Sequence, residues 1–364
     1  MPTGASQSFY LQDQPSPPFQ LELENSYFRV KLYDAQAFFQ ANSLLKNAES
    51  VIFSSSITSS FQPNHPTQSL HKISTIQRNT PCRLGLSPNL TEWLPAGSGA
   101  SLQINIKYTV LQGKPIQKFI DYMQQADLVA ELSLRPDWAV AAKVTKIVGK
   151  LLSFLAQEGS QQDLFSLVMD FNMADLKTGY HVIYGSHSDE VWPSPQFLRI
   201  DANGRLMDRS SEFSLARLSY AVIQVLGLKR LGQEEFRKEP WWQILQTVKQ
   251  DILDTDYSDE RERRQLFDQW YFALKQVRTI ADKQPNFLSS EIKEIIATAH
   301  GEVDQKLTSQ VTGESFGAAD ELPYELQEIL GVETEQDLQN LVRDYQDALE
   351  VSQRLLEQYH LSGD

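Results

Sequence analysis

The spacing of hydrophobic residues changes near Gln233. Between Phe19 and about Leu231, apolar residues recur at every second position, which places alternate side chains on opposite faces of a strand. The segment Leu102–Val110 alternates most strictly. After Gln233 the apolar residues recur every three or four positions, as they do along one face of a helix. The sequence therefore predicts a β-rich N-terminal part followed by a helical part.

The N-terminal part contains enough short strands for two sheets. Beyond Leu102–Val110, strands are predicted at 19–24, 27–33, 51–61, 128–134, 165–171, 180–184 and 218–226. Asn203-Gly204 suits a tight hairpin turn within 197–207. Two amphipathic helices are expected at 114–125 and 137–156. The predicted fold class is α+β: an N-terminal antiparallel β-sandwich or partly open barrel with two inserted helices, followed by an acidic all-α region.

The C-terminal part is predicted to hold several helices, and their start signals are readable. Pro240 suits a first helical turn, Ser258 is the expected cap of the next helix, and Thr334 with Asp337 resembles a capping box. A shorter helix is expected over 289–300. The expected organisation is a flexible lead (1–18), a β-rich domain (19–232), a helical domain (233–301), a linker (302–322) and a C-terminal helical or coiled-coil segment (323–364).

Negative charge is concentrated after the same boundary. Residues 233–364 contain 13 Lys and Arg against 28 Asp and Glu, a net charge of −15, whereas the first 232 residues contain 20 and 19, a net charge of +1. These sum to the −14 of the whole chain. An acidic surface repels nucleic-acid phosphates and either attracts basic partners or keeps the protein in solution. We therefore expect no nucleic-acid partner.

The last predicted helix has an apolar seam with alternating four- and three-residue spacing, which is typical of helices that pair. A protein partner or a second copy of the chain would bind along this seam, which contains Leu338, Val342, Tyr345, Leu349, Leu356 and Tyr359.

Specific catalytic and metal-binding motifs are missing. The sequence has no GxxxxGK[ST], no GxGxxG after a strand, and no CxxC or HExxH. No metal and no cofactor are therefore expected. The densest group of potential ligands and bases, His181, His187, Asp189 and Glu190, leaves open a hydrolase with its site near 181–190. Trp241, Trp242, Trp270 and Tyr271 have helical spacing that favours a core over a ligand-stacking platform.

A second alternative is a membrane-surface function. Lys143, Lys146 and Lys150 share one face of the predicted 137–156 helix, opposite its apolar side, which is the pattern of a helix lying on an anionic surface. The acidic helical part would then mask this face. No apolar run reaches the ~18 residues of a spanning helix, and no signal-peptide pattern is seen at the N-terminus. With Cys82 as the only cysteine, a cytoplasmic location is expected.

Together these patterns predict a non-enzymatic interaction protein, a scaffold or adaptor that acts through its acidic C-terminal helices. Missing motifs support this only in part, because many enzymes carry no readable motif. The two alternatives stay open at this point.

Overall fold

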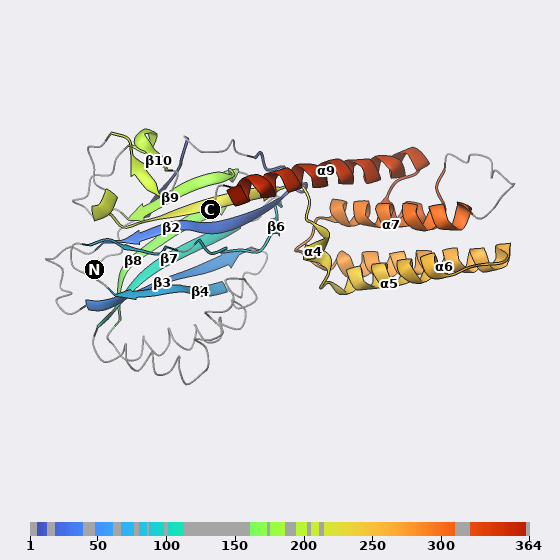
Figure 1. The fold of residues 1–364 in the computed structure, drawn as a ribbon, viewed down its shortest axis with the longest axis horizontal. Helices are drawn as coiled ribbons and strands as arrows, with labels where there is room; N and C mark the ends of the chain where they lie inside the picture. The colour runs from blue at the N-terminus through green and yellow to red at the C-terminus, as the bar shows by residue number, and fades with distance from the viewer. Residues whose placement is uncertain are drawn as a thin grey trace. The chain divides into compact units, whose positions relative to one another are not determined.

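A computed structural model describes the two parts of the chain as an N-terminal region of antiparallel sheets and a C-terminal region of helices, which confirms the predicted fold class (Figure 1). The chain divides into two compact units. We call them the sheet unit (Met1–Leu23, Phe28–Gly227 and Gln358–Asp364) and the helical unit (Glu24–Tyr27 and Leu228–Glu357). The residues described are 6–12, 19–38, 48–60, 67–75, 80–85, 87–97, 101–112, 161–172, 175–185, 194–201, 205–210, 215–309 and 321–361.

The first sheet has the strand order β1-β9-β12-β2-β5, with β6 also paired to β2. Its strands are β1 (Ser6–Tyr10), β2 (Tyr27–Ala37), β5 (Cys82–Arg83), β6 (Leu94–Pro95), β9 (Gly179–Gly185) and β12 (Tyr220–Leu228). Every residue of β12 is buried. Since β12 is central and its neighbouring side chains point to opposite faces, both faces of this sheet must be covered.

The second sheet has the order β4-β3-β7-β8 and is antiparallel throughout. Its strands are β3 (Ala48–Ser59), β4 (Thr67–Thr75), β7 (Ser101–Gln112) and β8 (Gln161–Asn172). The two sheets share one hydrophobic core, in which Phe28 and Ile223 of the first sheet lie with Phe53 and Ile104 of the second. They therefore form a sandwich.

The other face of the first sheet is covered by a hairpin, β10 (Leu198–Ile200) paired antiparallel with β11 (Leu206–Asp208). Leu198, Ile200 and Leu206 are buried against Tyr180 and Val222 of the sheet. The two paired strands confirm the predicted hairpin; Asn203 and Gly204, its predicted turn, lie outside the described residues. Two 3-10 turns, η2 (Pro195–Phe197) and η3 (Leu215–Arg217), flank the hairpin in sequence.

The helices are α4 (Gln233–Phe236), α5 (Pro240–Asp254), α6 (Glu260–Ala281), α7 (Ser289–Ser309), α8 (Tyr324–Leu330) and α9 (Glu335–Leu361). Pro240 lies in the first turn of α5, as predicted. The predicted capping box before α9 is confirmed, because the Asp337 amide donates to Thr334 Oγ1 and that hydroxyl donates to Asp337 Oδ2. Ser258 is not the cap of α6: Asp259 accepts from the Glu262 amide, and Ser258 donates to the Glu262 carboxylate.

Two further predictions about elements were wrong. Residues 19–24 form no strand, because the chain turns there and Glu24 has a φ of 61°. The predicted linker 302–322 is helical at its start, since α7 continues to Ser309 with Val303 and Leu307 fully buried. The two inserted helices, 114–125 and 137–156, and the strand 128–134 lie outside the described residues. Among the described helices, none combines the length and apolar character needed to cross a membrane.

Candidate protein-interaction surface

The helical unit is built on a buried aromatic core. Trp241 and Trp270 are fully buried, Trp242 nearly so, and Phe236 packs against both Trp241 and Trp242. Trp270 Nε1 donates to His300 Nδ1 at 3.1 Å, and burial lowers the pKa of His300 to about 4, so that imidazole is a neutral acceptor at pH 7. The prediction that the tryptophans form a core is confirmed. They offer no platform for a ligand.

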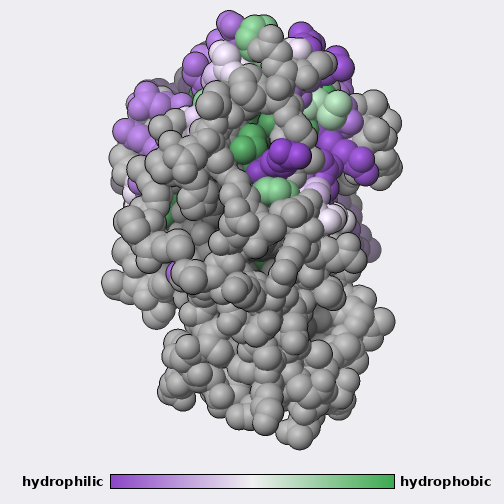
Figure 2. Space-filling model, turned by 90° about the vertical axis from the view of Figure 1, so that its left-hand side faces the viewer, coloured by the Kyte–Doolittle hydropathy of each residue, from purple (hydrophilic) through white to green (hydrophobic). Residues whose placement is uncertain are grey.

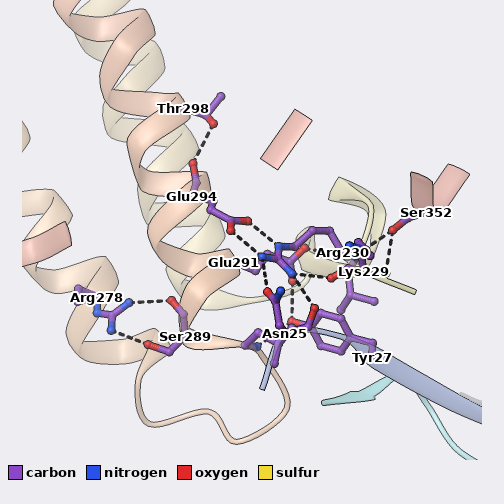
Figure 3. Close-up of polar contacts among 12 residues, drawn as sticks. Asn25, Tyr27, Lys229, Arg230, Arg278, Ser289, Glu291, Glu294, Thr298 and Ser352 are labelled. Carbon is purple, nitrogen blue, oxygen red and sulfur yellow. Dashed lines mark hydrogen bonds and ion pairs between the residues drawn. The ribbon is translucent and has the colours of Figure 1, made fainter. Parts of the chain in front are cut away.

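A cluster of buried charges ties four segments of the helical unit together (Figure 3). Arg230 forms two hydrogen bonds of 2.6 Å with the carboxylate of Glu294 on α7. The same guanidinium donates to the backbone oxygen and to the side-chain oxygen of Asn25. The backbone amides of Lys229 and Arg230 donate to Ser352 Oγ on α9. The cluster therefore fixes segments that are more than a hundred residues apart in sequence.

Glu291 is the second buried carboxyl group of this cluster. It accepts hydrogen bonds from the Tyr27 hydroxyl at 2.5 Å and from the Leu231 amide at 2.7 Å. Burial raises the pKa of Glu291 to about 8, against the lowering effects of the Tyr27 hydrogen bond and of the Arg230 charge. Because Tyr27, Arg230, Glu291 and Glu294 are all buried, the cluster presents no charged group to a substrate.

Among the described residues of the helical unit, two large aromatic side chains are exposed. Phe272 on α6 is 64% exposed and Tyr324 at the start of α8 is 74% exposed. The ion pair of Lys275 with Glu328 raises the pKa of Lys275, and Glu325 and Tyr324 lie near enough to contribute. Residues three or four apart share a helix face. Phe272, one turn before Lys275 on α6, therefore lies close to the ion pair that joins α6 to α8.

Acidic side chains surround these two aromatics. Asp268 lies one turn before Phe272 on α6, Glu325 follows Tyr324, and both are exposed. Burial raises the pKa of Tyr271 to about 12, and the charges of Asp304, Glu325 and Asp268 contribute to this rise. Residues 321–337 contain six acidic residues and no Lys or Arg. We call the group Asp268, Phe272, Tyr324, Glu325 and Glu328 the aromatic–acidic face.

The predicted pairing seam of α9 is largely used within the chain. Leu338 and Tyr345 are buried, while Val342, Leu349, Leu356 and Tyr359 are partly buried. Burial raises the pKa of Tyr345, and the charges of Glu291, Glu294 and Arg230 lie close enough to affect it as well. In the sheet unit, the Tyr359 hydroxyl donates to the Gly227 oxygen at 2.9 Å. The 3.5-residue spacing thus serves intramolecular packing.

The sequence predicted other candidate sites, and few of their residues are described. Lys143, Lys146 and Lys150 lie outside the described residues, as do His187, Asp189 and Glu190. His181 is buried on β9, 2.8 Å from the Lys177 backbone oxygen and packed against the rings of Tyr10 and Phe171. It is a core residue. Over the ranges that the structure covers, no group of three or more His, Cys, Asp or Glu could hold a metal ion.

One polar pair was not singled out from the sequence. His71 Nε2 on β4 lies 2.8 Å from Ser55 Oγ on β3, the distance of a base hydrogen-bonded to a nucleophile. However, Ser55 is only 4% exposed, and its neighbours on that face of β3, Phe53 and Ile57, belong to the sandwich core. Burial lowers the pKa of His71 to about 4. The pair satisfies two polar groups inside the core.

Comparisons with known proteins give no family for this chain. No family model, no curated protein and no solved structure matches it.

Proposed function

We propose that this chain is a non-enzymatic protein-interaction protein, a scaffold or adaptor, that binds its partners through the acidic helical unit. The observation that carries the proposal is the aromatic–acidic face. Phe272 and Tyr324 expose apolar surface, and burying this surface in an interface is favourable. The nearby carboxylates disfavour acidic partners. Aromatic side chains of this kind are frequent anchors in protein interfaces.

The alternatives have less support. The hydrolase alternative rests on His187, Asp189 and Glu190, and the membrane alternative on Lys143, Lys146 and Lys150, all outside the described residues. The described polar clusters are built from buried groups that bond to one another. An exposed surface with anchors is the feature that the described geometry offers to another molecule.

Affinity capture from the native host with the full chain tests the proposal. The wild-type protein is compared with F272S/Y324S and with the control Q346S/Q353S, which changes two exposed polar residues of α9. We expect at least one captured protein that F272S/Y324S loses and the control retains. Equal capture by all three proteins, with unchanged circular dichroism, would contradict the proposal.

A further inference from the structure

The sheet unit carries an exposed surface of the opposite sign on the hairpin β10–β11. Arg199 and Met207 are directly opposed across the two strands. Because Leu198, Ile200 and Leu206 point into the core, the alternate residues of both strands point outward. The outward set is exposed, and we call it the arginine face: Phe197, Arg199, Arg205, Met207 and Arg209.

The two acidic residues of the hairpin are less exposed than its arginines. Asp201 accepts a hydrogen bond from the Arg205 amide at 2.8 Å, and Asp208 accepts from the amide and the hydroxyl of Ser210. Both are half-buried, whereas the three arginines are exposed. The hairpin thus presents at least the side chains of Arg199 and Arg205 to solvent.

Apolar side chains accompany the arginines. Phe197 is 40% exposed and Met207 is 42% exposed. Figure 2 shows hydrophobic and hydrophilic residues side by side in the upper part of this view, the level at which Figure 1 draws β10. Arginine and aromatic or methionine side chains are the types enriched at protein interfaces. This combination is the complement of the aromatic–acidic face, which has two aromatics among carboxylates.

We propose that the arginine face docks on the aromatic–acidic face of a second copy of this chain. The inference rests on the proposed function and names a partner for its surface. Charge complementarity supports it: the exposed Arg199 and Arg205 on one face meet Asp268 and Glu325 on the other, and each face supplies two exposed apolar anchors. Because the two faces differ, the contact is head-to-tail, and it produces a ring or an open chain of copies.

A second copy suits the arginine face better than a membrane does. A few arginines attract an anionic surface only modestly, and the other charges of the chain sum to a strong negative excess that the surface would repel. In the head-to-tail contact, the arginines meet two of the carboxylates that contribute to that excess, Asp268 and Glu325.

Complementary charge reversal tests the proposal on the full chain. R199E/R205E makes the arginine face acidic, and D268R/E325R makes the aromatic–acidic face basic. The control R343E/R354E carries the same change in net charge as R199E/R205E, but on exposed arginines of α9. Sedimentation velocity across a range of protein concentrations measures association, and circular dichroism checks folding.

We expect wild type and control to associate, each reversed variant alone to weaken association about tenfold or more, and an equimolar mixture of the two variants to associate again. A monomeric wild type, or association that both reversals leave unchanged, would overturn the proposal. So would binding of the monomeric wild type to phosphatidylserine vesicles that R199E/R205E abolishes. Host proteins captured through Phe272 and Tyr324 would still support the proposed function in each of these cases.

Discussion

At the scale of single residues, the buried charges of the helical unit are out of balance. Arg230 is paired with Glu294, which leaves Glu291 with hydrogen bonds from Tyr27 and Leu231 but no cation of its own. An isolated ionised carboxylate is costly to bury, so the carboxyl group keeps its proton to a higher pH. Sequence patterns could not reveal this, because Glu291 and Glu294 read as ordinary polar positions of an amphipathic helix.

Glu291 therefore makes the stability of the helical unit depend on pH. Its pKa is about 8 in the fold against an ordinary value of 4.5. The folded state holds the proton over this window while the unfolded state releases it, so stability is lost as pH rises from about 4.5 through about 8. The charged or titratable groups around Glu291 are Tyr27, Arg230, Glu294 and Tyr345, and all remain in the variant below.

In E291Q this loss disappears. At pH 5 the variant is expected to be about as stable as the wild type, because the amide replaces a protonated carboxyl group of the same shape. The difference in stability should grow in favour of E291Q as pH rises to 9, where the wild type must bury a charge and the variant does not. Urea unfolding at pH 5, 6, 7, 8 and 9 measures it, with E325Q as the exposed control. Curves for wild type and E291Q that run parallel across this range would show that Glu291 stays ionised.

At the scale of elements, a glycine in the sequence does not by itself mark the end of a helix. Gly301 follows the predicted end of a helix, yet α7 passes through it for two more turns. The stripe of buried residues continues as Ile292, Ile296, Val303 and Leu307. Burial of that stripe outweighs the low helix propensity of one glycine, which costs about 1 kcal/mol. Gly331 is the opposite case, since its φ of 71° ends α8 in the left-handed conformation.

The same substitution should therefore act with opposite signs at these two glycines. G301A is expected to stabilise the protein by about 0.5–1 kcal/mol, because a Cβ there meets nothing within 4 Å and the helix gains alanine's propensity. G331A is expected to destabilise it by about 1 kcal/mol, because alanine is strained at positive φ. Denaturation midpoints of both variants check this. A destabilised G301A would mean that residues 302–309 are not helical.

At the scale of the whole molecule, the two compact units are discontinuous in sequence. The helical unit takes Glu24–Tyr27 from the N-terminal part, and the sheet unit takes Gln358–Asp364 from the C-terminal end. By their contacts, α8 and nearly all of α9 belong to the same unit as α5–α7. Removing α9 would expose the hydrophobic surface that it buries.

A chain ending at residue 332 should therefore aggregate or unfold. It loses the buried side chains of Leu338, Tyr345 and Ala348 and the Ser352 hydroxyl that accepts from Lys229 and Arg230. Soluble yield and the thermal midpoint of the full chain and the truncated chain measure the effect. A truncated chain with an unchanged midpoint would show that α9 is an accessory helix, available for pairing as the seam spacing suggests.

The sequence by itself determined the change from strands to helices near Gln233, the hairpin, most helix starts and the concentration of negative charge, because hydrophobic period, capping residues and charge are local properties. Tertiary structure decided which of these features reach solvent. The seam of Leu338 and Tyr345 and the indoles of Trp241 and Trp270 are buried, whereas Phe272 and Tyr324 are exposed. No local pattern separates these sets, because a helix face becomes core or surface only through the other elements that pack against it.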